Sequence, residues 1–435
     1  MVKRIIPVLI AITIITGFCI FYFNSHENQI TLEFGMFAGS NWGVENANSY
    51  VIIDKAIKTF EQKHKNVKIH YYSGILKEDY SEWFSRQVLL GKTPDVFMIL
   101  SSDFDRFVSL GVLEELGGLM KKDAGFTTED YYSSTLSAGI YKGMQYALPY
   151  ETVPTLMFVN KTLLEKEGIE LPENNWTWND LYDICSKVTK DTDGDKILDQ
   201  FGTYNYDWHE AIYTNGVQLF DADGKHANFN DEKVIDSIKF TKKINDINQG
   251  RKVTQVDFDN GKVAFMPLLF SDYRTYKTYP YKVKKYSNFK WDCITLPAGT
   301  KGGNISEINT LLMGISNRTK HKELAWEFLK QLTYDQEIQM DIFRYSQGAS
   351  VLKNVTHSKR AEAILGEDIE DSDKIIDNEL LSQVIEKGIS APKFRKYEES
   401  ITLAESEIEK ILFENKNIDS SLKIIQRKVN QYLKR

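Results

Sequence analysis

The pattern of apolar and polar residues predicts strands and helices that alternate along the first part of the chain. Residues 31–37 alternate as a strand does, and residues 51–64 place Ile53 and Phe60 on one side of a helix. Residues 95–100 are almost wholly apolar, which predicts a buried strand. Strands that alternate with helices indicate an α/β protein.

The last part of the chain changes to a helical pattern. Beyond Lys320 the apolar residues follow the period of a helix, and residues 401–433 contain two amphipathic segments that separate near residues 415–419. We therefore expect a mostly helical C-terminal region behind the α/β part.

Residues 147–181 carry the most specific pattern in the chain. Residues 155–159 are rich in β-branched and aromatic side chains, which suits a buried strand. Residues 161–167 then predict a short helix that ends at Gly168, because glycine tolerates the left-handed conformation found after a helix. Thr177 is placed to cap a second helix.

The order of these features resembles the extracellular solute-binding proteins of bacterial ABC importers. The segment reads strand, Asn-Lys, short helix, Gly-Ile, Pro, Trp-Thr-Trp, helix. Similar features follow in the family's order, namely Gly-Lys-Thr-Pro-Asp-Val at 91–96, Gly-Lys-Val-Ala-Phe-Met at 261–266 and Glu-Leu-Ala-Trp-Glu-Phe-Leu at 323–329. The class it resembles most is the sugar-binding one (family 1), which includes the maltose-binding proteins. This resemblance implies a two-lobed periplasmic-binding-protein fold (class II-like) with an interlobe hinge.

The resemblance also implies lobes that are built from discontinuous segments. Residues 1–29 are then a leader and spacer, residues 30–148 and 299–344 form lobe 1, and residues 149–298 and 345–435 form lobe 2. The expected hinge crossings are Tyr146–Tyr150, Thr295–Gly299 and Arg344–Val351.

Composition narrows the choice of compartment and partner. A chain of 435 residues exceeds the usual size of one core, which agrees with two lobes. The formal net charge of −7, without a basic stripe, argues against nucleic acid as a partner. Three cysteines are too few for a disulfide framework, and we interpret Cys185 and Cys293 as buried thiols.

The N-terminus predicts attachment to a membrane. Lys3 and Arg4 precede an apolar run of nineteen residues, Ile5–Phe23, which is long enough to cross a bilayer. We favour an uncleaved signal anchor. The alternative is lipidation of Cys19, although Phe18 departs from the small residue that normally precedes a lipidated cysteine. Both alternatives place the protein on the outer face of the cell membrane.

An acidic loop could hold a metal ion. Carboxylates at alternate positions can surround one hard cation such as Ca²⁺, and a backbone carbonyl can add a ligand. The candidate ligands are Asp191, Asp193, Asp195, Ile197 and Asp199. The loop departs from an EF-hand, because Lys196 replaces the usual glycine and Gly202 replaces the closing glutamate. A solvated acidic turn is the alternative, and a bound ion would be structural.

Aromatic residues gather in loops that could bind a sugar. Sugars present C–H faces to rings and hydroxyls to polar side chains, and loops at strand ends are where open α/β sheets bind ligands. The candidate ligand-binding residues are Trp42, Asp103, Tyr150, Glu151, Trp208, Phe270, Tyr273 and Arg274. We expect Trp42, Trp208 and Tyr273 to face one another across the interlobe groove. The alternative is that these rings pack in a core.

Signs of catalysis are weak. The sequence contains no Gly-x-Ser-x-Gly, no His-Glu-x-x-His and no phosphate-binding glycine-rich loop, so we do not expect an enzyme. A glycoside hydrolase is a remote alternative. The resemblance implies a monomeric receptor that closes around a carbohydrate and delivers it to the permease subunits of an ABC importer. The rival within the same fold is a membrane-anchored sensor that works with a histidine kinase.

Overall fold

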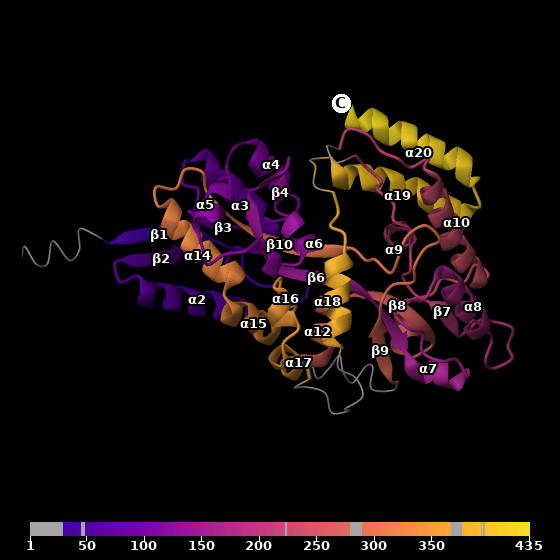
Figure 1. The fold of residues 1–435 in the computed structure, drawn as a ribbon. Helices are drawn as coiled ribbons and strands as arrows, with labels where there is room; N and C mark the ends of the chain where they lie inside the picture. Colours follow the sequence, from indigo (N-terminus) through magenta and orange to yellow (C-terminus); the bar gives the residue numbers. More distant parts are fainter. Residues whose placement is uncertain are drawn as a thin grey trace, which may run out of the picture.

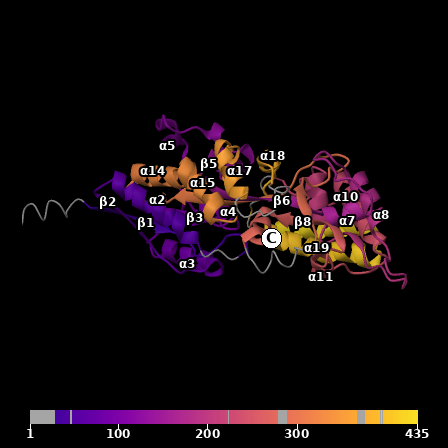
Figure 2. The same ribbon diagram turned by 90° about the horizontal axis from the view of Figure 1, so that it is seen from below.

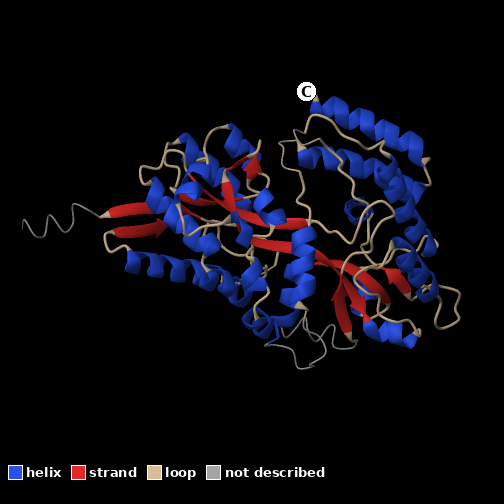
Figure 3. Ribbon diagram, viewed as in Figure 1, coloured by secondary structure: helices blue, strands red, loops and turns tan. Residues whose placement is uncertain are grey.

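The computed structural model describes residues 29–44, 48–221, 224–278, 289–366, 376–392, 394 and 396–435. The apolar run Ile5–Phe23, with Cys19, lies outside the described residues, so the expected anchor does too. No helix in the described part of the chain is long and apolar enough to cross a membrane. The chain folds into two lobes with strands between them (Figures 1 and 3).

One mixed sheet of eight strands runs through both lobes. Its order is β2-β1-β3-β10-β6-β8-β7, and β9 also pairs with β6. The bounds are β1 Ile30–Gly35, β2 Val67–Tyr71, β3 Val96–Ile99, β6 Ala147–Asn160, β7 Phe201–Thr203, β8 Val263–Leu269, β9 Trp291–Ile294 and β10 Ile308–Ile315. A separate hairpin pairs β4 (Ile140–Tyr141) with β5 (Met144–Gln145). β1 is parallel to β2 and β3, whereas β10 is antiparallel to β3 and β6.

Strand β6 joins the two lobes. Its first part pairs with β10 as far as Pro154, and from Thr155 onward it pairs with β8 and β9. The strand expected at 155–159 is therefore the lobe 2 end of a longer strand. The expected crossing at 146–150 lies within the lobe 1 part of β6.

Pro149 made the first part of β6 difficult to recognise in the sequence. Proline cannot donate a hydrogen bond to a sheet, and the sequence predicted a hinge crossing at Tyr146–Tyr150 instead of a strand. In the structure Pro149 pairs with Leu312, where the register between β6 and β10 shifts. Such irregularities accommodate a residue that would break a regular ladder.

Helices cover both faces of the lobe 1 part of the sheet (Figures 1 and 2). They are α2 Ser49–Lys63, α3 Lys77–Leu89, α4 Phe104–Ser109, α5 Gly117–Lys122, α6 Ser133–Ser137, α14 Lys322–Tyr334 and α15 Gln336–Tyr345, with a 3₁₀ turn at Thr128–Asp130. Edge-to-face aromatic contacts join α2 and α14 to the sheet. The ring centroid of Phe328 on α14 lies 5.3 Å from that of Phe60 on α2 and 5.5 Å from that of Phe34 on β1.

Lobe 2 contains the remaining α/β units and two long C-terminal helices. Its helices are α7 Lys161–Lys166, α8 Trp178–Val188, α9 Trp208–Thr214, α10 Glu232–Ile247, α11 Gln255–Asp259, α12 Phe270–Thr278, α19 Tyr397–Glu414 and α20 Ile418–Leu433. Thr177 caps α8 as expected and forms a capping box with Asp180.

The segment after α15 is shared between the lobes, whereas the sequence-based division assigned 345–435 to lobe 2. The helices α16 (Lys353–Thr356), α17 (Lys359–Gly366) and α18 (Asn378–Lys387) pack with α15 and α6 of lobe 1. Helices α19 and α20 pack on α10 of lobe 2. The return segment also differs, because the N–H groups of Gly299 and Gly303 donate to Thr214 of lobe 2. The chain therefore returns to lobe 1 at β10 and not at residue 299.

Candidate functional site

A buried carboxylate lies on β6, the strand that joins the lobes. Glu151 is 4% exposed; the hydroxyl of Ser346 donates to its Oε1, and the N–H of Gly348 donates to the same oxygen at 2.7 Å. Burial raises the pKa of Glu151, while Ser346, the indole of Trp42, Gly348 and the charge of Arg274 each lower it. Groups from four other positions in the chain thus converge on one carboxylate.

The backbone at Gly348 approaches Glu151 too closely for any side chain. A Cβ there would lie 2.2 Å from Oε1 of Glu151. Gly348→Ala therefore displaces the carboxylate, and we expect the free energy of unfolding to fall by about 1–3 kcal/mol in urea denaturation. Gly118→Ala is the control, because a Cβ at Gly118 meets nothing within 4 Å. Equal stability of the two variants would contradict this account.

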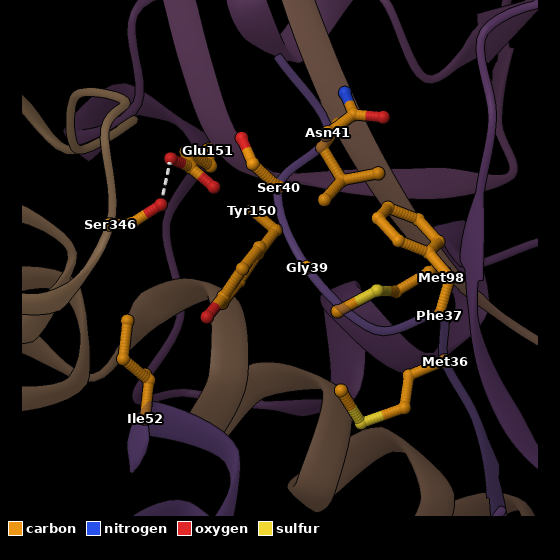
Figure 4. Close-up of a pocket in the computed structure, with 11 residues that line it drawn as sticks. Met36, Phe37, Gly39, Ser40, Asn41, Ile52, Met98, Tyr150, Glu151 and Ser346 are labelled. Carbon is orange, nitrogen blue, oxygen red and sulfur yellow. Dashed lines mark hydrogen bonds between the residues drawn. The ribbon is translucent and has the colours of Figure 1, made fainter. Parts of the chain in front are cut away.

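A small pocket opens beside Glu151 (Figure 4). It is lined by the loop after β1 and by residues of α2, β3, β6, β10 and the segment after α15, namely Met36, Phe37, Gly39, Ser40, Asn41, Ile52, Met98, Tyr150, Glu151, Leu311 and Ser346. Ser40, Asn41 and Glu151 offer a hydroxyl, an amide and a carboxylate, and the other side chains are mainly apolar. The pocket has a volume of about 30 Å³, so this combination can hydrogen-bond one polar group of a ligand and pack against the adjoining apolar atoms.

Two glycines shape the loop after β1. Gly39 and Gly43 have φ of 83° and 73°, a conformation that favours glycine. Between them, the hydroxyl of Ser40 accepts the N–H of Trp42 at 3.0 Å, and Lys77 donates to the carbonyl of Asn41. These bonds hold Ser40 and Asn41 at the pocket.

Gln339 of α15 holds the backbone of Tyr150 in place. Tyr150 is 4% exposed, and burial raises the pKa of its hydroxyl well above the usual value. Nε2 of Gln339 donates to the Tyr150 carbonyl at 3.0 Å, and its Oε1 accepts from Ser350 Oγ at 2.8 Å and from Val351 N at 3.1 Å. The segment after α15 is thereby attached to β6.

Helix α12 brings three of the expected residues to the same region, but their side chains are buried. Phe270 and Tyr273 stack at 5.7 Å and are 0% and 1% exposed. The Tyr273 hydroxyl accepts the N–H of Ile376 at 3.4 Å. Arg274 is 7% exposed and donates to the carbonyl of Phe343 at the end of α15.

Asp103 is held elsewhere in lobe 1. Its Oδ1 accepts from Ser81 Oγ at 3.0 Å and from Arg106 Nη2 at 2.7 Å. Burial raises the pKa of Asp103, and Ser81 and Arg106 lower it. Arg106 also reaches Ser85 at 3.2 Å, so α3 and α4 run side by side in the same direction. Asp103 is thus part of the packing of these helices and does not line the Glu151 pocket.

Trp208 lies in lobe 2, apart from the Glu151 pocket. It begins α9, which Asp207 and Glu210 start with a capping box. Trp208 is 3% exposed, packs 3.9 Å from the ring of His209 and belongs to the cluster formed by α9, α10, α19 and α20. Its edge lines a second pocket together with Tyr213 and Tyr397.

A polar cluster that the sequence did not predict lies beside the second pocket. Glu307 precedes β10, and its carbonyl accepts the N–H of Thr155 at 3.1 Å, so it lies where β6 passes between the lobes. Burial raises the pKa of Glu307, and the charge of His209 and the hydroxyl of Tyr213 lower it. Burial also raises the pKa of Tyr397 to about 12. Glu307 and Tyr397 are distant in sequence from His209 and Tyr213 of α9, and only the fold brings them together.

Comparison with known proteins identifies the family. Residues 45–337 match the model of the bacterial extracellular solute-binding proteins, which is more than half of the 435 residues. The chain belongs to this family. The resemblance stated from the sequence is thus confirmed.

Individual members of the solute-binding family are distant from this chain. A protein of Brucella abortus described as a binding protein is 24% identical over 258 residues, which cover 55% of this chain and 58% of the relative. The mannitol-binding protein of Pseudomonas aeruginosa is 22% identical over 152 residues, 34% of this chain and 33% of that protein. The matched parts thus span little more than half of these curated relatives, or less.

Solved structures confirm the two-lobed fold of the solute-binding proteins. The sugar-binding protein MalE of Xanthomonas citri superposes with a TM-score of 0.75 at 16% identity, covering 93% of this chain and 97% of that one. An ABC substrate-binding protein of Listeria monocytogenes in complex with cycloalternan gives a TM-score of 0.67 at 18% identity, covering 93% and 99%. Members of the family are binding proteins of the cell exterior, in agreement with the placement expected from the sequence.

The structure brings together only part of the expected ligand set of this solute-binding protein. Trp42, Tyr150, Glu151 and Arg274 meet at β6, whereas Asp103 and Trp208 do not join them. The rings of Trp42, Trp208 and Tyr273 were expected to face the interlobe groove. In the structure these residues are only 8%, 3% and 1% exposed. Their roles as ligand contacts stay predictions.

The acidic loop of the solute-binding protein folds around its own carboxylates. One oxygen each from Asp191, Asp193 and Asp195 lies within 4.8 Å of the others. Asp199 instead accepts from the N–H and hydroxyl of Thr192, at 2.9 and 2.7 Å. Lys196 has a φ of 72°, the conformation that favours the glycine usual at this position of a calcium loop. The first three carboxylates thus fit a hard cation, and Asp199 contributes to the turn.

Proposed function

We propose that this protein is the carbohydrate-binding receptor of an ABC importer. The observation that carries the proposal is the pocket beside Glu151, where Ser40, Asn41 and Tyr150 meet at the strand that joins the lobes. The loop with Ser40 and Asn41 follows the carboxyl end of β1, the usual place for ligands in open α/β sheets. A hydroxyl, an amide and a ring suit the hydroxyls and C–H faces of a sugar.

Ligand binding would act by closing the lobes. The Glu151 carboxylate on β6 accepts hydrogen bonds from Ser346 and Gly348, and the charge of Arg274, on α12 in lobe 2, lowers its pKa. A sugar that contacts both lobes favours the closed form by its differential affinity for that form. The closed receptor would then deliver the sugar to the permease subunits.

Relatives with known ligands support the carbohydrate class. The Listeria structure was solved with cycloalternan, another similar structure is a cyclic alpha-maltosyl-1,6-maltose binding protein of Arthrobacter globiformis, and the Pseudomonas relative binds mannitol. All three ligands are rich in hydroxyl groups. A thermal-shift screen against mono- and oligosaccharides tests the proposal, because a ligand that binds only the native state raises its melting temperature. Conversion of a labelled sugar would instead favour a glycoside hydrolase.

Membrane attachment forms part of the proposal. The apolar run Ile5–Phe23 behind Lys3 and Arg4 supports an N-terminal anchor on the outer face of the cell membrane. Acylation of Cys19 would attach the protein to the same surface.

Calcium binding at the acidic loop is a separate expectation. Asp191, Asp193 and Asp195 would hold the ion and stabilise the loop between α8 and β7. We expect a chelator to lower the melting temperature of the wild type, and Asp193→Ala to abolish this difference. Identical melting curves of the wild type with and without chelator would show an ordinary acidic turn.

A further inference from the structure

The outer end of lobe 1, opposite lobe 2, is built around the start of β1 (Figure 1). The N–H of Ile30 donates to the carbonyl of Asn66 at 2.8 Å, which places the turn between α2 and β2 beside the start of the strand. The N–H of Asp95 donates to the carbonyl of Glu33 at 2.8 Å, and the turn between α3 and β3 therefore lies on the other side of β1.

Two more turns complete this end of the lobe. The N–H of Ser316, after β10, donates to the carbonyl of Asp95 at 2.9 Å. The N–H of Asn317 donates to the carbonyl of Val112, after α4, at 2.9 Å. Five segments that are far apart in the sequence therefore form one surface where the described chain begins.

Three leucines of this surface are exposed. Leu89, Leu90 and Leu110 are 87%, 61% and 69% exposed. Leu89 and Leu90 lie at the end of α3, and Leu110 lies at the end of α4. The two helices pack through Phe84 and Phe107, whose ring centroids are 4.7 Å apart. Because the two helices run in the same direction, their leucine ends lie on the same side of the lobe.

Four cations lie at the same end of lobe 1 as these leucines. Lys65, Lys92, Arg318 and Lys320 occupy the same turns and are all exposed. None of the four lies within 4.0 Å of a carboxylate in the described part of the chain. The positive charge of these four side chains contrasts with the net charge of −7 of the whole protein. Exposed apolar side chains with cations at the same end of the lobe suit the interface of an anionic bilayer.

We propose that this outer end of lobe 1 rests on the lipid membrane, with its leucines at the acyl boundary and its cations among anionic headgroups. The inference rests on the proposed N-terminal attachment. If the anchor ends at Phe23, residues 24–29 span at most about 20 Å. The start of β1 is therefore kept close to the membrane. The surface around it is the part of the described chain that lies nearest to the anchor. Lobe 2 then points away from the bilayer.

Hydrogen exchange of the full-length chain tests this orientation. In phosphatidylglycerol vesicles, the amides of 88–92 and 109–112 should exchange at least about fivefold more slowly than in detergent. A factor of about five corresponds to the attraction of a single lysine or arginine to an anionic membrane surface. Protection should fall at high salt. The combined change Lys65→Glu, Lys92→Glu, Arg318→Glu and Lys320→Glu should abolish it. The matched control carries the same charge change on exposed positions of lobe 2, namely Lys423→Glu, Arg427→Glu, Lys434→Glu and Arg435→Glu, and should keep it.

The outcomes separate this inference from the proposed function. A full-length chain that fails to sediment with vesicles would remove the attachment and this inference together, but not sugar binding. A chain that sediments without protecting the leucine amides would overturn the inference alone. Protection in detergent that grows with protein concentration would identify a second copy as the occupant, and protection only in the presence of the permease would identify the importer. Either result would also overturn the proposal that this end of lobe 1 contacts the lipid membrane.

Discussion

Glu151→Ala is expected to lower the free energy of unfolding by about 1–3 kcal/mol for each buried donor that loses its acceptor. The truncation would leave the N–H of Gly348 and the hydroxyl of Ser346 without their shared acceptor. Ser346 and Gly348 belong to the segment that attaches α15 to β6, so we expect this segment to loosen as well. Urea denaturation measures the loss.

A surface glutamate provides the control for this experiment. Glu399 is exposed on α19, and Glu399→Ala should change stability by less than about 0.5 kcal/mol. Glu151→Gln keeps the shape and one acceptor oxygen and should lose less than Glu151→Ala. If Glu151→Ala were as stable as Glu399→Ala, the carboxylate would not hold the joining strand.

Trp208→Ala is expected to cost about 3–5 kcal/mol of folding stability, as truncation of a large core aromatic does. The sequence alone favoured a ligand contact for Trp208, whose loss would weaken sugar binding without destabilising the fold. The structure instead buries it to 3% exposure between α9, α10, α19 and α20. Thermal and urea unfolding should therefore both show a large loss.

An exposed ring of the same lobe is the matched control. Phe413 on α19 is 73% exposed, and Phe413→Ala should leave stability nearly unchanged. If Trp208→Ala reduced sugar affinity but was as stable as Phe413→Ala, the result would support the assignment of Trp208 to the ligand groove.

Local features of the fold were predictable because nearby residues determine them. The short helix after β6 ends before Gly168, which has a φ of 67°, and Thr177 caps α8. The break expected between the two C-terminal helices occurs at Asn415, in a left-handed conformation, after α19. Capping and left-handed turns depend on a few consecutive residues, so a single sequence reveals them.

The division between lobes and the details of the site were less predictable, because they depend on long-range packing. Glu151 directly follows the predicted hinge crossing at Tyr146–Tyr150, but its partners Ser346 and Gly348 are 195 and 197 residues away. The sequence gives no sign that α15 to α18 return to lobe 1 while α19 and α20 remain on lobe 2. Burial of an aromatic ring is decided by the same contacts, which is why Trp208 was interpreted as a groove residue.

Isothermal titration of the purified protein with a panel of mono- and oligosaccharides tests the central claim most directly. We predict saturable binding of at least one carbohydrate, and a clear loss of affinity in Asn41→Ala, whose side chain lines the Glu151 pocket. The unfolding midpoint of this variant should match that of the wild type, because Asn41 is bound to the fold through its backbone carbonyl. Absence of binding across the panel, or unchanged affinity in Asn41→Ala, would contradict a carbohydrate receptor that uses this pocket.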